Sequence, residues 1–452
     1  MADVGMKREE RRSKPKDYKK VLKGMFRYVG HEWPIMLTAL IFVFIANMLA
    51  LWGPRFSGQA IDAMGIGAGD VNFPEGARHA VITLACLLGS ALFNFMMRRL
   101  MIKASQRTIR RMRQDTFNKI VELPLAYIDT HQAGDLVSRI SYDLDVVNHS
   151  LTNDIIQISA SLITVIGSII MMWQISPPLS LIFLLMLPVT VLFTRYRIKR
   201  TKPLFRKRSH KLGEMNGYVE EILSGQKTIR AYDKEGFFNE EFDEVNSEAI
   251  GAYYKADYQA AFNGPSVGLI SNLALAFVSL FGALLYLRSS LTIGNLSSFI
   301  LYSRRFSGPI NQIANLYAEL QSAASAAERV FSLLEQPSEP ADRPGAIEFT
   351  DVTGKVEFRN VSFAYEPGVP IIKDLNFTAK PGSLTAIVGP TGAGKTTLIN
   401  LLMRFYDPQE GAILVDDIDI RDVTRRSLRR SFAMVLQDSW LFRGTIKENI
   451  AY

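Results

Sequence analysis

Six apolar stretches constrain this chain more than any other feature of its sequence. Each is close to the roughly 20 residues that a helix needs to cross a bilayer. Within hydrocarbon, a segment can satisfy its backbone groups only as a helix or in a closed barrel. The sequence therefore predicts an all-α membrane domain of six spans. They are residues 35–52, 80–97, 155–175, 179–196, 267–287 and 293–313, and the last has the weakest pattern.

The charged residues orient these spans. The chain has 52 lysines and arginines against 44 acidic residues, a net charge of +8, which fits either nucleic acid or an anionic membrane surface. The apolar blocks favour the lipid bilayer, and we expect no nucleic-acid partner. Basic side chains concentrate in residues 98–113 and 195–208, after the second and fourth spans. The positive-inside rule then predicts a multi-pass plasma-membrane protein with both termini in the cytoplasm.

The segments around the spans also have a helical pattern. Residues 17–33 are amphipathic and predict a helix in the membrane interface, with packing on a soluble domain as the alternative. Apolar residues keep helical spacing through residues 98–123 and 195–229. Spans two to five should therefore extend about 25 residues, or about 38 Å, beyond the membrane. Pro124 should end the first extension before a short crosswise helix, and the second turnaround is expected at residues 231–242.

Three prolines at residues 337, 340 and 344 mark the end of the helical part. The predicted divisions are a cytoplasmic N-terminus with the interfacial helix (1–34), a transmembrane domain (35–335), a linker (336–344) and a final domain (345–452). In that last domain, residues 356–365, 371–379 and 384–388 are predicted strands.

The third of these strands leads into a phosphate-binding loop. Gly389, Gly394, Lys395 and Thr396 fill the pattern G-x-x-x-x-G-K-[ST] between a strand and a helix expected over residues 398–404. Glycines allow backbone N–H groups to wrap a phosphate, Lys395 should reach the β- and γ-phosphates, and Thr396 should ligate Mg²⁺. The predicted ATP-binding residues of the loop are Gly389, Pro390, Thr391, Gly392, Ala393, Gly394, Lys395, Thr396 and Thr397.

Two residues outside the loop complete the predicted site. Gln437 follows an apolar strand predicted at residues 432–436, and its amide could meet Mg²⁺ and an attacking water. Tyr365 could stack on adenine, or could be a core aromatic residue of its strand. Asp416 and Asp417 also follow an apolar run, but we interpret them as a tight turn and not as a metal ligand.

The motifs VSFAY, GPTGAGKTT and VLQDSWLFRGTIKENIAY, together with six spans, resemble an ATP-binding cassette (ABC) exporter half-transporter of the bacterial multidrug and lipid-flipping type. The resemblance covers nearly the whole chain. PLAYIDTHQAGDLVSRISYD and EEILSGQKTIRAYDKE are similar to the two intracellular loops of that family, and AAERVF to the end of its sixth helix.

The resemblance implies a fold and a site. The fold is a six-helix transmembrane domain followed by the N-terminal part of a RecA-like α/β nucleotide-binding domain. Tyr365 becomes the adenine-stacking residue, the loop becomes Walker A, and Gln437 becomes the Q-loop glutamine. The two turnarounds become coupling helices, and the second is expected to dock on a partner subunit. The Asp416-Asp417 pair departs from the family's usual Asp-Gly, at a small cost in backbone strain.

The family's signature loop, Walker B strand, catalytic glutamate and switch histidine have no counterpart before Tyr452. We therefore expect the sequence to belong to a longer protein. No catalytic residue of its own is expected in residues 1–452 beyond the water and Mg²⁺ positioning by Gln437. We also expect an open sheet edge beside residues 384–388, doubtful folding of residues 345–452 alone, and at best weak ATP binding without turnover.

The predicted function is ATP-driven export of an amphipathic small molecule, lipid or peptide by alternating access, in a homodimer or heterodimer with a second half-transporter subunit. The alternative is an ATP-binding membrane protein with a regulatory or channel-like role. An exporter with a built-in cysteine protease does not fit, because the only cysteine, Cys86, lies in a span. Arg304 and Arg305, inside the sixth span, either line a cavity or extend to the membrane surface.

Overall fold

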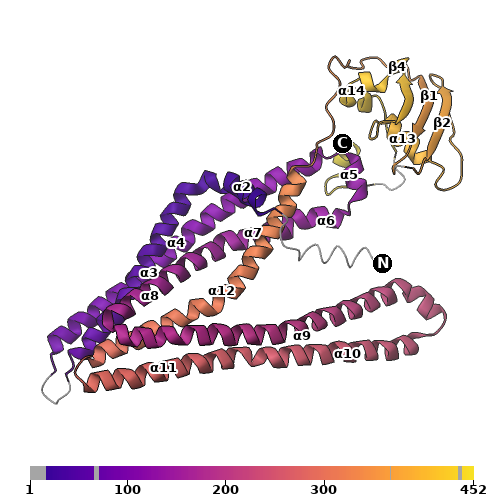
Figure 1. Ribbon diagram of the computed structural model, residues 1–452. Coiled ribbons are helices and arrows are strands. Elements are labelled where there is room, and N and C mark those ends of the chain that lie inside the picture. The colour runs from indigo at the N-terminus through magenta and orange to yellow at the C-terminus, as the bar shows by residue number, and fades with distance from the viewer. Residues whose placement is uncertain (1–16, 66–70, 367, 436–439, 452) are drawn as a thin grey trace. The chain divides into compact units, whose positions relative to one another are not determined.

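The computed structural model describes residues 17–65, 71–366, 368–435 and 440–451 (Figure 1). Long helices make up the chain as far as residue 334, and a small sheet domain follows. The helices are α2 (Tyr18–Val29), η1 (Gly30–Glu32), α3 (Trp33–Asp62), α4 (Phe73–Glu122), α5 (Leu125–Thr130), α6 (Ala133–Ser138), the π-helical η2 (Arg139–Asp143), α7 (Leu144–His149), the π-helical η3 (Ser150–Asp154), α8 (Ile155–Ile175), α9 (Pro177–Ala231), α10 (Glu235–Ala261), α11 (Asn263–Leu287) and α12 (Ile293–Leu334).

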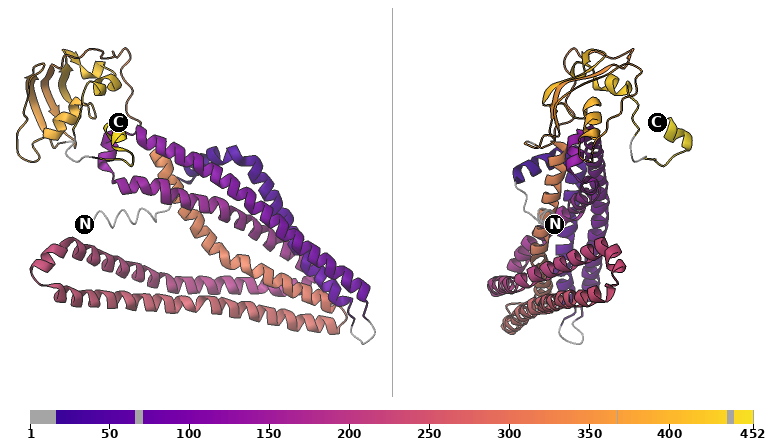
Figure 2. Two further views of the ribbon diagram at one scale, coloured as in Figure 1. Left: turned by 180° about the vertical axis from the view of Figure 1, so that it is seen from behind. Right: turned by 90° about the vertical axis from the view of Figure 1, so that its right-hand side faces the viewer.

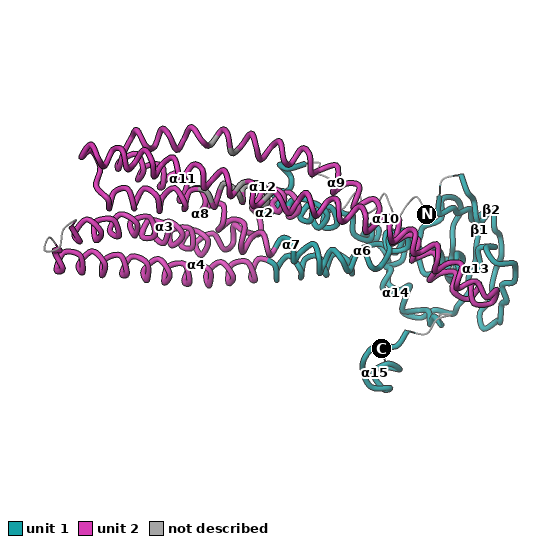
Figure 3. The backbone as a smooth tube through the Cα atoms, turned by 90° about the horizontal axis from the view of Figure 1, so that it is seen from below, with its two compact units in different colours: residues 1–25, 109–147, 324–452 teal, residues 26–108, 148–323 magenta. Residues whose placement is uncertain are grey.

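The described residues form two compact units, coloured separately in Figure 3. One contains residues 26–108 and 148–323, and so most of the membrane helices. The other contains residues 1–25, 109–147 and 324–452, and so the first turnaround (α5 and α6), the end of α12 and the sheet domain.

Five helical stretches in the described part of the chain are long and apolar enough to cross a membrane. They contain the first five predicted spans. The sixth predicted span, in α12, is not among them and stays a prediction. The stretches are Tyr18–Asp62, Phe73–Glu122, Ala133–Ile175, Pro177–Ala231 and Glu235–Leu287.

The helical extensions are present. α4 has 50 residues and α9 has 55, which at 1.5 Å per residue is about 75 and 82 Å. Pro124 ends the first extension as predicted, since its φ of −64° and ψ of 148° lie outside the helical region. The short helix after it is α5. α9 and α10 run side by side as a long hairpin (Figures 1 and 2).

The second turnaround lies within the predicted residues 231–242, but it contains no separate coupling helix among the described residues. α9 ends at Ala231, and α10 begins at Glu235 and continues unbroken to Ala261. The reversal is a tight turn in which Asp233 has a φ of +52°, a conformation that aspartate adopts more readily than most residues. No proline interrupts residues 235–242, so nothing ends the helix early.

α3 and α12 are joined by a close contact between the C-terminal end of α3 and the N-terminal end of α12, which we call the α3–α12 clasp. The carboxylate of Asp62 accepts hydrogen bonds from the Thr292 hydroxyl and the Gly294 N–H, both at 2.8 Å. It thereby caps the N-terminus of α12. Gly58 and Gly294 lie so close that a Cβ on either would overlap the backbone oxygen of the other.

The inner half of the clasp surrounds a proline in α3. Pro54 has no N–H, so the carbonyl of Ala50 loses its helical partner; the Arg305 guanidinium donates to it instead. The Ser298 hydroxyl donates to the Pro54 carbonyl at 2.8 Å and the Tyr302 hydroxyl to the Leu51 carbonyl at 2.5 Å. Three polar side chains of α12 therefore stabilise the interrupted backbone of α3.

The sheet domain has four antiparallel strands in the order β2-β1-β3-β4. Its core contains Phe358, Val361, Ile413 and Val415 from the sheet and Leu401 from a helix. The strands are β1 (Val356–Phe363), β2 (Ile372–Ala379), β3 (Glu410–Val415) and β4 (Ile418–Asp419), and the helices are α13 (Lys395–Leu402), η4 (Ile420–Asp422), α14 (Arg425–Arg430) and α15 (Ile446–Ile450).

β1 and β2 confirm two predicted strands, but the predicted strand at residues 384–388 is wrong. These residues join no sheet, and the side chains of Leu384 and Val388 are 101% and 88% exposed. Residues 432–435 of the other predicted strand are also irregular, with Val435 96% exposed; residue 436 lies outside the described residues. A strand exists only when another pairs with it, and no other described strand pairs with these segments.

Candidate nucleotide-binding site

The phosphate-binding loop connects the exposed segment 384–388 to α13. Gly392 and Gly394 have φ values of +86° and +85°, which favour glycine strongly. Gly394 also lies against the sheet domain, since a Cβ there would be 3.0 Å from Cγ2 of Ile371. Gly392 and Gly394 therefore have the conformational role that the motif predicts. At Gly394 the contact with Ile371 also leaves little room for a side chain.

The lysine of the loop is folded back on it. Lys395 Nζ donates to the carbonyls of Gly389 and Pro390, both at 2.8 Å. Thr396 is exposed and Thr397 is buried. The loop therefore presents a cation and an exposed hydroxyl at the N-terminus of α13, an arrangement that fits a phosphate group.

Tyr365 lies beside the helix of the loop. Its hydroxyl accepts a hydrogen bond from Asn400 Nδ2 in α13 at 3.2 Å. Its ring makes edge-to-face contacts with Phe363 and Tyr406, each with centroids 4.9 Å apart, and 41% of the residue is exposed. The structure thus brings Tyr365 to the loop helix as part of an aromatic cluster with an accessible side.

The other predicted ligand, Gln437, lies outside the described residues. Among the described residues, no group of three or more His, Cys, Asp and Glu side chains could hold a metal ion. An open recess of about 510 Å³ on the same domain is lined by Glu348, Phe349, Arg426 and Arg430, among others, and includes no loop residue.

Asp416 and Asp417 form the turn of the β3–β4 hairpin, as predicted. Their φ values are +49° and +65°, the pattern of a type I′ turn. The Asp416 carboxylate accepts hydrogen bonds from the N–H groups of Thr353, Gly354 and Lys355 and from the Thr353 hydroxyl, at 2.6–3.1 Å. Burial raises the pKa of Asp416, but these hydrogen bonds outweigh it and leave the pKa below its ordinary value. The carboxylate therefore organises the neighbouring loop. This role explains why position 416 holds an aspartate, although a glycine there would have less backbone strain.

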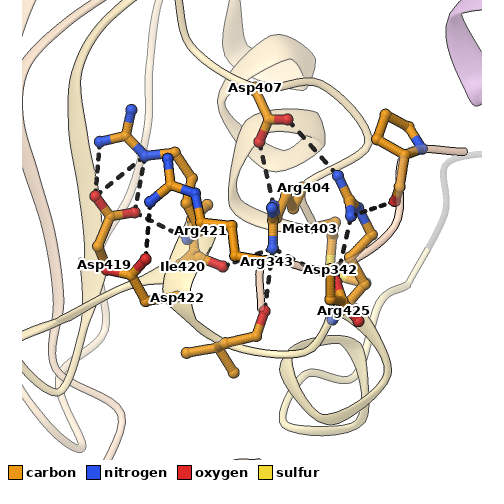
Figure 4. A network of polar contacts seen from close by, with 12 residues as sticks. Asp342, Arg343, Met403, Arg404, Asp407, Asp419, Ile420, Arg421, Asp422 and Arg425 are labelled. Carbon is orange, nitrogen blue, oxygen red and sulfur yellow. Dashed lines mark hydrogen bonds and ion pairs between the residues drawn. The ribbon is translucent and has the colours of Figure 1, made fainter. Parts of the chain in front are cut away.

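A network of arginines fixes the far end of α13 (Figure 4). Arg404 follows the helix with a φ of +52°, a position usually held by glycine. Its buried guanidinium donates to the carbonyls of Ile420 and Val423 at 3.0 Å and to Asp407 at 3.2 Å. Arg425 donates to Asp342 and to the Pro340 carbonyl of the linker. The network thus ties the loop helix, the β4 region and the linker together.

Two further contacts join this domain to the first turnaround, between α4 and α6. The Tyr406 hydroxyl donates to Asp129 of α5 at 2.6 Å. Arg429 of α14 binds both carboxylate oxygens of Glu339, whose N–H donates to the Glu122 carbonyl at the end of α4 at 2.9 Å. Sequence reasoning missed Tyr406, Asp129 and Glu339, because their partners are up to 277 residues away. Only the aromatic neighbour of Tyr406, Phe405, gave a local signal.

Comparison with known protein families identifies the family of both parts of the chain. The family model described as the ABC transporter transmembrane region matches residues 36–310, and the one described as ABC transporter matches residues 372–451. The chain belongs to the ABC transporter family. The transmembrane match runs from the first turn of α3 to residue 310 within α12, and the second match covers β2, the loop and the hairpin turn. Membership of the family implies nucleotide binding by the sheet domain.

Several curated ABC transporters are similar over most of this chain. A Bacillus subtilis protein named an uncharacterized ABC transporter ATP-binding protein, YfiC, is 37% identical over 98% of this chain and 73% of its own length. A Mycobacterium tuberculosis protein named a fatty acid ABC transporter ATP-binding/permease protein is 42% identical over 84% of this chain and 60% of its own length. The yeast mitochondrial ATP-dependent permease MDL2 is 31% identical over 97% and 58%. The chain thus spans about three fifths to three quarters of the length of these relatives.

Proposed function

We propose that the full-length protein, as encoded by its gene, is one subunit of an ATP-driven exporter. It would pair with a second half-transporter subunit, identical or different, and move an amphipathic molecule out of the cytoplasm by alternating access. The observation that carries this proposal is the presence, in one chain, of a transmembrane region and a phosphate-binding loop with its lysine and glycines in position.

The residues of the site have separate roles in this proposal. Tyr365 would stack on adenine, and Lys395 would exchange the carbonyls of Gly389 and Pro390 for the β- and γ-phosphates. Thr396 would ligate Mg²⁺, with Gln437 completing the ion's contacts. The ion would supply charge neutralisation on the phosphate oxygens. Because these hydrogen bonds hold Lys395 Nζ at the loop, the cation would already lie close to the bound phosphates.

The amphipathic substrate class follows from the spans, whose long apolar faces suit an alkyl chain or a hydrophobic peptide. The mycobacterial relative is named for fatty acids, which belong to this class. The contacts of Tyr406 with Asp129 and of Arg429 with Glu339 would carry movement between the nucleotide site and the intracellular ends of the helices.

ATP turnover in proteoliposomes containing the full-length protein and its partner tests the proposal. Lys395→Ala should abolish turnover and substrate movement, because no other loop residue supplies a point charge to the phosphates. Lys380→Ala, an exposed lysine of the same domain, is the matched control and should behave like the wild type. Undiminished turnover with Lys395→Ala would refute the site, and turnover without substrate movement would favour a regulatory or channel-like role.

The proposed orientation is testable separately. In a Cys86→Ala background, single cysteines at Gly67 and at Ser209 should react with impermeant reagents from opposite sides of a plasma-membrane vesicle. Reaction of both from the same side would overturn the six-span arrangement with cytoplasmic termini.

A further inference from the structure

Two adjacent arginines of α12, Arg304 and Arg305, have different surroundings. Arg305 is half-buried and donates to the Ala50 carbonyl in the α3–α12 clasp. The side chain of Arg304 is exposed and has no hydrogen bond or ion pair to any residue that the structure describes. Arg305 thus has a structural role, whereas the positive charge of Arg304 has no partner among the described residues.

The clasp fixes which way each arginine points. Ser298, Tyr302 and Arg305 contact α3 and are spaced four and three residues apart, which places them on one face of the helix. Arg304 is about 200° around the helix axis from Tyr302. It therefore lies on the side away from α3.

That side of α12 has no large apolar side chain at the next two positions, four and eight residues after Arg304. Gly308 and Gln312 follow Arg304 at four and eight residues, and both are exposed. Gln312 accepts a hydrogen bond from Gln157 of α8 at 2.7 Å. A guanidinium, a glycine and an amide pair thus form one stripe within the sixth predicted span.

At its depth in the sixth predicted span, the charged side chain of Arg304 is unfavourable in contact with lipid hydrocarbon. It is the twelfth residue of α12, about 17 Å along the helix from its outer end, and the hydrocarbon core is about 30 Å thick. A charged side chain near the middle of the bilayer normally faces a water-filled cavity or a charged partner. The stripe is therefore suited to a polar pathway through the membrane domain.

The spans supply no anion to neutralise this charge. The six apolar stretches contain no aspartate or glutamate. The carboxylate of the clasp, Asp62, is already bound to Thr292 and Gly294. A negatively charged ligand would complement Arg304, whereas a cationic one would meet repulsion without any attracting carboxylate in the spans.

We propose that Arg304 binds the anionic headgroup of the transported molecule, a carboxylate or a phosphate carried on an alkyl chain. The guanidinium offers paired N–H donors that match either group, and the apolar faces of the spans would hold the chain. This inference rests on the proposed export function and narrows its substrate class to anionic amphiphiles.

The test compares four twelve-carbon probes, namely laurate, dodecyl phosphate, dodecyltrimethylammonium and dodecanol, below their micellar concentrations. ATP turnover by the reconstituted full-length protein with its partner should rise with one or both anions and not with the cation or the alcohol. Comparison of laurate with dodecyl phosphate distinguishes the two headgroups. R304Q should raise the half-maximal concentration of the effective anion at least about tenfold, equivalent to about 1.4 kcal/mol. R304K, which keeps the charge, should recover most of the affinity.

R305Q is the matched control, because it removes the neighbouring charge from the same helix turn. It should lower the melting temperature while leaving the preference for the anion over the cation unchanged. Equal stimulation by all four probes, or a wild-type response in R304Q, would overturn the inference while leaving the export function standing. Direct binding of radiolabelled laurate, which needs no ATP, tests Arg304 even if turnover fails: weaker binding in R304Q supports the site, and equal binding refutes it.

Discussion

The hydroxyl of Tyr406 lies 2.6 Å from a carboxylate oxygen of Asp129, 277 residues earlier in the chain. The ring of Tyr406 also contacts that of Tyr365, the residue predicted to stack on adenine. Burial and the bond to Asp129 raise the pKa of Tyr406 above its ordinary value. One side chain therefore touches both Tyr365 of the predicted nucleotide site and helix α5 of the first turnaround.

We predict that Tyr406→Phe and Asp129→Asn are not additive. Each should lower the thermal stability of the full-length protein, and a double-mutant cycle should give a coupling free energy of about 1 kcal/mol. That is below the range for hydrogen bonds to charged groups because the pair is partly exposed. The Phe variant keeps the ring contacts with Tyr365, so it isolates the hydroxyl. Strict additivity would show that the bond contributes nothing to stability.

Gly392 and Gly394, two of the three glycines of the phosphate-binding loop, offer a matched comparison. Both have φ near +85°, but a Cβ at Gly392 would meet nothing within 4 Å, whereas one at Gly394 would lie 3.0 Å from Ile371. Gly392→Ala should cost about 1–2 kcal/mol of backbone strain alone, and Gly394→Ala should cost clearly more. The melting temperatures of the two variants, measured by thermal unfolding, would rank these losses of stability. Equal losses would mean that the contact with Ile371 relaxes freely.

Asp416 should contribute stability that depends on pH. Its pKa is lower in the folded protein than the ordinary value of 3.8, so the contribution is complete above about pH 4 and is lost as the pH falls through the folded value. Asp416→Asn tolerates the positive φ but removes the charge, and should cost about 1–2 kcal/mol at pH 7. This difference from the wild type should shrink in acid.

Asp417→Asn is the control for that experiment. Asp417 is exposed and makes one ion pair with Lys355 at 2.6 Å, so its replacement should change stability by less than about 1 kcal/mol. A larger loss from Asp417→Asn than from Asp416→Asn at pH 7 would contradict the role assigned to the Asp416 carboxylate.

The α3–α12 clasp predicts unequal effects of alanine along one helix. Gly294→Ala would place a Cβ against the backbone of Gly58, which cannot move as a side chain can. It should lower stability by about 2–3 kcal/mol or more. Gly308→Ala, in the same helix with no atom within 4 Å of its Cβ, should be neutral or slightly stabilising. Equal melting temperatures for the two variants would show that the helices separate easily at this point.

The sequence predicted what depends on local pattern. The apolar stretches identified five of the helices, and the spacing of Gly389, Gly394 and Lys395 identified the loop. The strand at residues 384–388 was wrong because a β-branched run specifies a strand only where a neighbour pairs with it. The second turnaround lies within residues 231–242 as predicted, but it is a tight turn and not a separate helix, because no proline interrupts α10 after Glu235.

Long-range partners had no local signal. Arg305 is a charged residue in the sixth predicted span and Pro54 interrupts the backbone hydrogen bonds of α3, and their connection emerges only when α3 and α12 are placed side by side. The spacing of residues alone could not show that Arg305 is half-buried and Arg304 exposed. The clasp, which fixes the rotation of α12, decides between them.

Pro54 also has a consequence for how the protein is made. The Ala50 carbonyl, which the proline leaves without a helical donor, is paired by a side chain 255 residues later. At about 5–20 residues per second, a ribosome needs roughly 13–50 s to reach Arg305. During that interval α3 is in the membrane with an unsatisfied carbonyl, which is costly in hydrocarbon. Water or the insertion machinery must supply a temporary donor, and α3 reaches its final state only after translation of the last span.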